Sequence, residues 1–258
     1  MLLIEYRIKL PLSFDLYKIA NLHTTMEMSK EYTKPGEGVE ILENVPCDVA
    51  CLPQHNPNSR NSVQKVQRTS KRYYIPDFIT SHLTKDSVVL RESSFNGFPN
   101  FRTVVTAESG TTGEFTIDTL CMTDDDANKD NVFKLPQIIL DKRSVINIDI
   151  VNDALPPELV KEGDDPKKVL GLKDDWNSSF IPMVVYKLVF VKSNDEIINT
   201  LIRDNLRTMF NLFHRKLVCS QDRWIGLNIK DIRTMEDDTK DLLDQRRAAS
   251  DLPSPASG

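Results

Sequence analysis

The most regular pattern of apolar residues in the chain is the run "PMVVYKLVFVK" at residues 182–192. Successive side chains of a strand point to opposite faces, and Lys187 is the single charged residue between Met183 and Val191. Both faces are otherwise apolar, which is typical of a strand that is covered on both sides. Two interpretations of Lys187 stay open. It lies near a sheet edge, where its long side chain reaches water, or it forms a polar floor in an apolar cavity and binds an acidic group of a ligand.

The same kind of pattern predicts several more strands and two long helices. Strand-like stretches cover residues 1–10, the second half of 34–46, and residues 62–74, 87–92, 101–107, 114–122 and 145–151. A helix is predicted over residues 14–30, with Ser13 as its N-cap. A continuous apolar stripe from Ile198 to Leu217 predicts a second, longer helix, and Asn228 is placed to cap a third with a narrower stripe.

Together these elements predict an α+β fold with a mostly antiparallel sheet of about seven or eight strands. A strongly curved sheet of this kind, closed over one long helix, can enclose a ligand cavity instead of a solid core. We expect a disordered tail at residues 248–258, where the sequence reads "AASDLPSPASG".

Composition narrows the class of protein. Of 258 residues, 28% are charged and 40% are apolar, as in ordinary soluble globular proteins. The net charge of −5 argues against a nucleic-acid partner. The four cysteines form no disulfide framework, and the start "MLLIEYRIKLPLS" is too charged for a signal peptide. We therefore expect a cytoplasmic protein.

No catalytic or metal-binding motif stands out. The four histidines belong to no nucleophile or metal constellation, and the chain has no G-x-S-x-G elbow, P-loop or H-E-x-x-H string. The acidic string "TDDDANKDN" lacks the glycine that a calcium loop needs. We expect a protein that is not an enzyme, binds no metal and has no cofactor.

Five strings, in order and at matching spacing, resemble the class I phosphatidylinositol transfer proteins. They are "GEGVEILEN" from Gly36, "NGFPNFRTVVT" from Asn96, "YKLVFVK" from Tyr186, "LFHRKLVC" from Leu212 and "DRWIGLNIKDIRTMEDDTKDLLDQ" from Asp222. The resemblance extends over nearly the whole chain.

This resemblance implies a single domain over residues 1–247 with a START-like, helix-grip fold, in which a curved sheet and two long helices enclose one phospholipid and a C-terminal helix acts as a lid. It also implies that the protein associates only transiently with membranes. The function would be extraction of a phosphatidylinositol or phosphatidylcholine molecule from one membrane and its delivery to another, by a monomer. Two alternatives stay open: a carrier of another lipid, such as phosphatidic acid or a sterol-like molecule, and a lipid sensor or scaffold that keeps the fold without transferring lipid.

The family motifs also imply site residues. Lys187 stands in the family's Tyr-Lys-Leu-Val string, Glu236 in its Arg-Met-Glu-Glu string and Asn96 in its Asn-Ala-Tyr-Pro string, and all three correspond to headgroup contacts. A cation, a carboxylate and an amide in a dry cavity suit a lipid phosphate and inositol hydroxyls.

Four further residues correspond to the cavity wall. Phe213 matches a phenylalanine near the headgroup, and Thr103 and Thr119 match pocket threonines. Phe101 replaces a pocket cysteine of the family and adds a ring to the wall.

Two departures from the family pattern bear on function. The family uses Thr-x-Lys on a strand to contact inositol, and "SVQKVQRTSKRYY" places Lys65 at either the lysine or the threonine, depending on the register, with no threonine restored in either. This leaves the preferred headgroup open. Where the family inserts a Trp-Trp pair into membranes, this chain reads "SNDE" at residues 193–196, which predicts weaker docking.

Overall fold

The computed structural model describes residues 2–47, 66–74, 89–108, 114–123, 129–176, 183–192 and 196–249. Its strands are β1 (Leu2–Leu10), β2 (Gly38–Cys47), β3 (Val66–Tyr74), β4 (Val89–Gly97), β5 (Asn100–Ala107), β6 (Glu114–Thr123), β7 (Ser144–Asp149) and β8 (Met183–Lys192). Its long helices are α1 (Phe14–Tyr32), α5 (Glu196–Cys219) and α7 (Ile229–Ala248). Short helical turns are α3 (Gln137–Leu140), η3 (Pro157–Leu159), η4 (Glu162–Asp164), α4 (Pro166–Leu170) and α6 (Gln221–Trp224).

The eight described strands form one sheet in the order β2-β3-β4-β5-β6-β8-β1-β7. All neighbouring strands are antiparallel except β1 and β7, which are parallel. The predicted α+β class with a mostly antiparallel sheet is confirmed. The interpretation that Lys187 lies near a sheet edge is wrong, because β8 pairs with β6 on one side and β1 on the other, and the edges are β2 and β7.

The alternating side chains of β8 belong to two apolar clusters, one on each face of the sheet. Val185 and Val189 belong to the main core on the helix side of the sheet, whereas Val184 and Tyr186 belong to a second cluster on the outer side. Residues 129–143 cover this outer cluster, to which Phe133 contributes a buried ring. The prediction that β8 is covered on both faces is therefore confirmed, and the physical reason is that both sets of alternating side chains are apolar.

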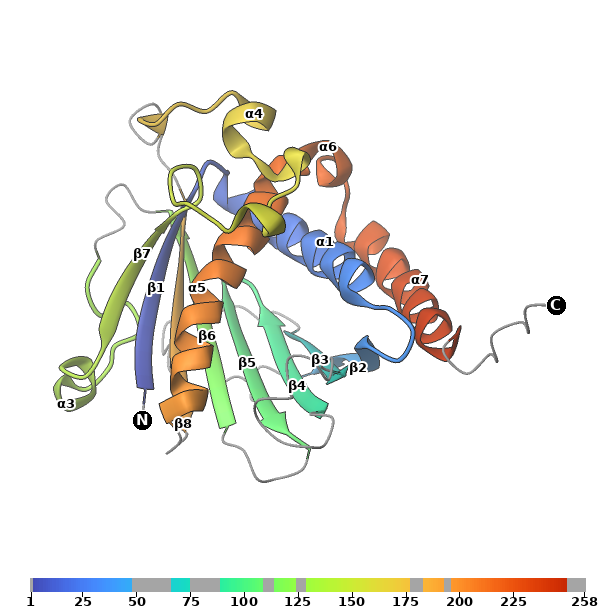
Figure 1. The fold of residues 1–258 in the computed structure, drawn as a ribbon, viewed down its shortest axis with the longest axis horizontal. Coiled ribbons are helices and arrows are strands. Elements are labelled where there is room, and N and C mark those ends of the chain that lie inside the picture. Colours follow the sequence, from blue (N-terminus) through green and yellow to red (C-terminus); the bar gives the residue numbers. More distant parts are fainter. Residues whose placement is uncertain are drawn as a thin grey trace.

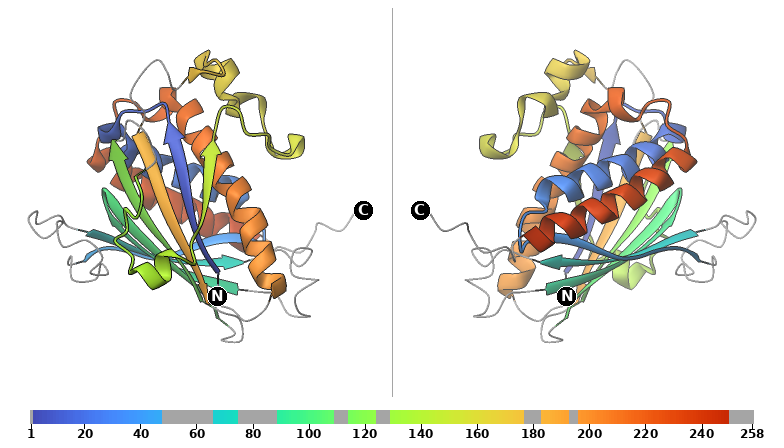
Figure 2. Two further views of the ribbon diagram at one scale, coloured as in Figure 1. Left: turned by 90° about the vertical axis from the view of Figure 1, so that its left-hand side faces the viewer. Right: turned by 90° about the vertical axis from the view of Figure 1, so that its right-hand side faces the viewer.

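Three long helices lie on the inner side of the sheet. In Figure 1, α5 runs in front of β8, with β1 to its left, while α1 and α7 run side by side over the other end of the sheet, as the second view in Figure 2 also shows. The helices α1 and α7 meet through Leu22, Met26 and Ile232, which are buried together. None of the described helices is both long and apolar enough to cross a membrane.

The helix ends agree only partly with the predicted caps. Asn228 caps α7 as predicted, and its side chain accepts hydrogen bonds from the Lys230 and Asp231 amides in a capping box. Ser13 precedes α1 as predicted, but its side chain makes no capping hydrogen bond. The helix α7 ends at Ala248, so the predicted domain boundary at residue 247 lies in its last turn.

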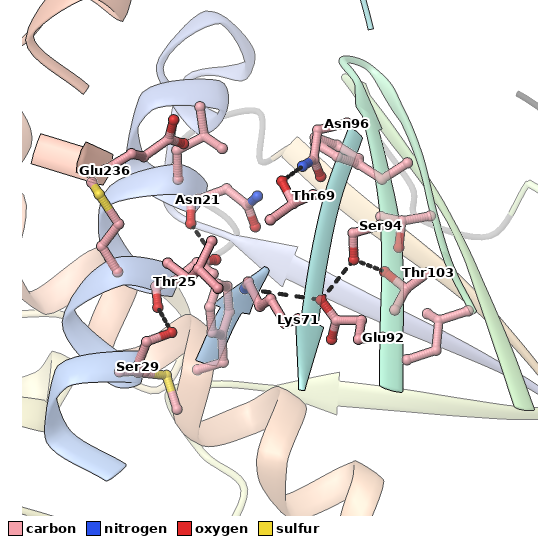
Figure 3. Close-up of a pocket in the computed structure, with 18 of the residues that line it drawn as sticks. Asn21, Thr25, Ser29, Thr69, Lys71, Glu92, Ser94, Asn96, Thr103 and Glu236 are labelled. Carbon is pink, nitrogen blue, oxygen red and sulfur yellow. Dashed lines mark hydrogen bonds and ion pairs between the residues drawn. The ribbon is translucent and has the colours of Figure 1, made fainter. Parts of the chain in front are cut away.

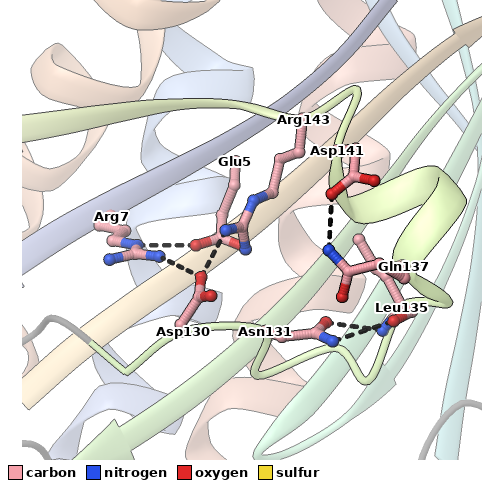
Figure 4. A network of polar contacts seen from close by, with 8 residues as sticks. All are labelled: Glu5, Arg7, Asp130, Asn131, Leu135, Gln137, Asp141 and Arg143. Carbon is pink, nitrogen blue, oxygen red and sulfur yellow. Dashed lines mark hydrogen bonds and ion pairs between the residues drawn. The ribbon is translucent and has the colours of Figure 1, made fainter.

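A buried ionic network fastens the outer segment 129–143 to β1 (Figure 4). The fully buried Glu5 carboxylate accepts hydrogen bonds from Arg7 Nε and Arg143 Nη1, both at 2.7 Å. Asp130 pairs with the same two guanidinium groups from the exposed side. A buried carboxylate requires such partners, because an unpaired buried charge is strongly destabilising.

We expect Glu5→Ala to lower the free energy of unfolding by about 3 kcal/mol, because it leaves two largely buried guanidinium groups with one partner fewer. Urea denaturation measures the change. Lys240→Ala, which breaks an exposed pair with Asp244 on α7, is the control and should cost less than about 1 kcal/mol. Equal effects of the two substitutions would contradict a stabilising role of the network.

Candidate functional site

A cavity of about 270 Å³ lies between the inner face of the sheet and the helices. Its wall contains residues from α1, from β2 to β6, from β8, and from α5 and α7. Met209 on α5 lines the cavity although 56% of this residue is exposed, so the cavity reaches the surface beside α5.

The structure brings seven of the eight predicted site residues into this one cavity. They are Asn96 on β4, Phe101 and Thr103 on β5, Thr119 on β6, Lys187 on β8, Phe213 on α5 and Glu236 on α7. Lys65, the eighth, lies outside the described residues. That these side chains contact a lipid stays a prediction, but their convergence from six elements shows that they can act on a single ligand.

The cavity wall is polar at one end and apolar at the other. One row of paired residues runs from Thr69 on β3 through Ser94 to Thr103 on β5. The same row continues into Ile117 on β6 and Val189 on β8. The β3–β5 end of this row can therefore hydrogen-bond a polar group, whereas its β6–β8 end is apolar. The neighbouring row ends in the polar pair Thr119 on β6 and Lys187 on β8, which both line the cavity.

Two residues of the polar end were missed by sequence reasoning. Thr69 and Lys71 both line the cavity and lie two residues apart on β3 (Figure 3). They form the Thr-x-Lys pattern that the family resemblance implies, so the expectation that this chain lacks the threonine is wrong. The string "RTSKRYY" carries this pattern, whereas the prediction placed it at Lys65, four residues before Thr69.

Lys71 is held in a polar cluster on the cavity wall. Its Nζ atom lies 3.9 Å from Glu92 Oε1, and Glu92 also accepts hydrogen bonds from Ser94 Oγ at 2.8 Å and from the Tyr73 hydroxyl at 2.9 Å. Burial raises the pKa of Tyr73 well above its usual value, and the Glu92 charge raises it further, so the hydroxyl stays a donor. The cluster offers a ligand both donors and acceptors.

The network around Asn44 joins this wall to α7. Asn44 Nδ2 donates to Glu236 Oε2 at 2.8 Å, and Asn44 Oδ1 accepts from Gln67 Nε2 at 2.8 Å and Thr69 Oγ1 at 3.2 Å. Arg233 forms a further short contact with Glu236 Oε2. We call these five residues the Asn44 network. The network places the Glu236 carboxylate on α7 beside Asn44 on β2, although the two residues lie far apart in the sequence.

Lys187 forms a separate cationic site within the same cavity. Its Nζ atom lies 3.3 Å from Thr119 Oγ1 and 5.1 Å from the centre of the Phe210 ring. Burial lowers the pKa of Lys187 from its usual 10.5 to about 8. The ammonium group is thus protonated near neutral pH but poorly hydrated, so an anionic ligand group would stabilise it.

Behind Lys187, a neutral histidine connects α1 with α5. His214 Nδ1 lies 2.6 Å from the Phe210 carbonyl oxygen and therefore donates to it, which leaves Nε2 to accept from the Tyr17 hydroxyl at 3.3 Å. Burial, and then the Lys187 charge, lower the pKa of His214 to about 3. His214 therefore stays uncharged and adds no second cation to the site.

The comparison with known families agrees with this geometry. The family model described as "Phosphatidylinositol transfer protein" matches residues 1–241. The chain belongs to this family. Among curated relatives, phosphatidylinositol transfer protein 2 of Dictyostelium discoideum is 32% identical, over 93% of this chain and 94% of that protein.

Other relatives of the phosphatidylinositol transfer protein family match over similar lengths. The human phosphatidylinositol transfer protein beta isoform is 29% identical, over 96% of this chain and 95% of that protein. Mouse membrane-associated phosphatidylinositol transfer protein 1 is 33% identical over 96% of this chain, which corresponds to 21% of that larger protein. The family's fold thus occurs both alone and within a longer chain.

Proposed function

We propose that this protein carries one phospholipid molecule, phosphatidylinositol or phosphatidylcholine, in the inner cavity and exchanges it between membranes without catalysing a reaction. The observation that carries this proposal is a single cavity with hydroxyl, amide and charged groups at its β3–β5 end and with apolar walls and one cation near β8. Such a wall matches a molecule that has a polar head, a phosphate and hydrocarbon chains.

The position of Lys187 suggests that it binds the phosphate and not the inositol ring. The strand β8 lies four strand steps from β3, which is roughly 19 Å along the sheet at about 4.8 Å per step. The strands β4, β5 and β6 thus separate Lys187 from Thr69 in the sheet. We therefore assign inositol hydroxyls to the Thr69, Lys71 and Glu236 end, and the phosphate to Lys187 and Thr119.

Burial of acyl chains would offset the cost of extracting a lipid from a bilayer, because each buried methylene contributes about 0.8 kcal/mol in either place. Exchange can then proceed without an energy source. The cavity of about 270 Å³ is smaller than the roughly 300–1,000 Å³ of sites for drug-sized ligands. A lipid with two acyl chains therefore requires the cavity to widen. The exposed Met209 on α5 marks where the cavity reaches the surface.

Native mass spectrometry of the purified protein, followed by transfer assays between vesicles, tests the proposal. We expect one bound phospholipid per chain and transfer of fluorescent phosphatidylinositol and phosphatidylcholine to acceptor vesicles. A bound lipid of another class, such as phosphatidic acid or a sterol, would replace the proposed ligand. Absence of any lipid, with no uptake from inositol-lipid vesicles, would overturn the carrier function and favour a scaffold with the same fold.

A further inference from the structure

The direction of each hydrogen bond in the Asn44 network is fixed by its chemistry. Glu236 is a carboxylate and can only accept, so the Asn44 amide group must point its Nδ2 donor at Glu236. The Asn44 oxygen then faces β3 and accepts from Gln67 and from the Thr69 hydroxyl. Asn44 on β2 therefore sets the orientation of Thr69 and Glu236, which approach the cavity from opposite walls.

This orientation determines what the cavity offers to a ligand. Thr69 uses its only proton in the bond to Asn44, so its Oγ1 presents acceptor lone pairs, one of which Asn96 Nδ2 approaches at 3.5 Å. Within the described residues, Asn44 and Arg233 both contact Oε2 of Glu236. The second oxygen, Oε1, is the acceptor that Glu236 can offer to a ligand, and Figure 3 shows Glu236 on the helix side and Thr69 on the strand side of the same pocket.

We propose that Asn44 is a specificity-determining residue, because it holds Thr69 and Glu236 as hydrogen-bond acceptors and so selects headgroups that carry several hydroxyl donors. This inference rests on the proposed lipid-carrier function. A polyol ring such as inositol donates to both acceptors, with Lys71 nearby as a donor to its oxygen atoms. A choline headgroup has no hydroxyl or N–H donor, so its binding does not depend on this arrangement.

The test is Asn44→Asp, which keeps the size of the side chain but replaces the donor with a second carboxylate beside Glu236. We expect phosphatidylinositol transfer to fall at least about tenfold, while phosphatidylcholine transfer changes less than about twofold. Asn44→Ala, which adds no charge, should shift the ratio of the two activities in the same direction by a smaller factor. The assay is vesicle-to-vesicle transfer of each fluorescent lipid, with thermal unfolding curves recorded for every variant.

Glu43→Gln is the matched control, because Glu43 is the neighbouring residue on β2 and pairs with Arg68 at 3.3 Å, outside the cavity wall. It should leave the ratio of the two activities unchanged. An equal loss of both lipids in Asn44→Ala with a normal unfolding curve would overturn the role of Asn44 in selectivity. Failure of the unmodified protein to transfer either lipid would instead overturn the proposed function, so the two results are distinguishable.

Discussion

Lys187→Met is expected to make the protein more stable and, at the same time, to impair transfer of both phosphatidylinositol and phosphatidylcholine. Hydrogen bonds to charged groups contribute about 1.5–3 kcal/mol, so loss of the ammonium should weaken binding of any phosphate-bearing lipid by roughly tenfold or more. Both lipids carry the phosphate, and therefore both should be affected to a similar extent. Vesicle transfer assays with each lipid measure this effect.

The gain in stability follows from the lowered pKa of Lys187. Because burial lowers this pKa from 10.5 to about 8, keeping the buried group protonated at pH 7 costs at most about 3 kcal/mol, less where the cavity admits water. Methionine has a similar length and no charge, so most of that cost should disappear. Urea denaturation of delipidated protein at pH 7 measures the gain.

The pH dependence gives an independent check with a defined sign. Between pH 8 and 10.5 the unfolded chain binds more protons at Lys187 than the folded chain does, so the free energy of unfolding should rise with pH in this window. Below pH 8 both states are protonated and the contribution is constant. Lys187→Met should lack this rise. A variant that is less stable than the original protein at pH 7 would show that the ammonium group is well solvated and would contradict the assignment.

Thr69→Val is expected to lower phosphatidylinositol transfer by roughly five- to a hundredfold while phosphatidylcholine transfer stays nearly unchanged. Valine keeps the shape of the side chain and removes the hydroxyl, which leaves an inositol hydroxyl and Asn44 Oδ1 without that partner. The quantity to measure is the ratio of the two transfer rates, because a general loss of folding would lower both.

The control for this substitution is Thr234→Val, which makes the same chemical change at an exposed position on α7. It should alter neither rate. Equal rates for Thr69→Val and the unmodified protein with phosphatidylinositol would mean that the headgroup does not reach the β3 end, and Lys187 would then be the main headgroup contact.

Local patterns in the sequence determined most of the architecture. The alternation around Lys187 predicted a strand covered on both faces, because burial on either side of a sheet requires apolar residues at every second position. Asn228 predicted the start of α7 through its capping chemistry. The family strings then indicated seven residues that line one cavity, although neither composition nor spacing alone would have joined them.

The tertiary structure alone decided how the polar residues are arranged. The strand β3 is polar along much of its length, so no run of apolar residues fixes its register, and only the pairing of Thr69 with Ser94 shows that Thr69 and Lys71 face the cavity. The contact of Asn44 with Glu236 joins residues 192 positions apart and has no local signature. Sequence determined which segments form strands and helices, because that choice depends on near neighbours, whereas the direction of the hydrogen bonds in the site depends on which distant groups the fold brings together.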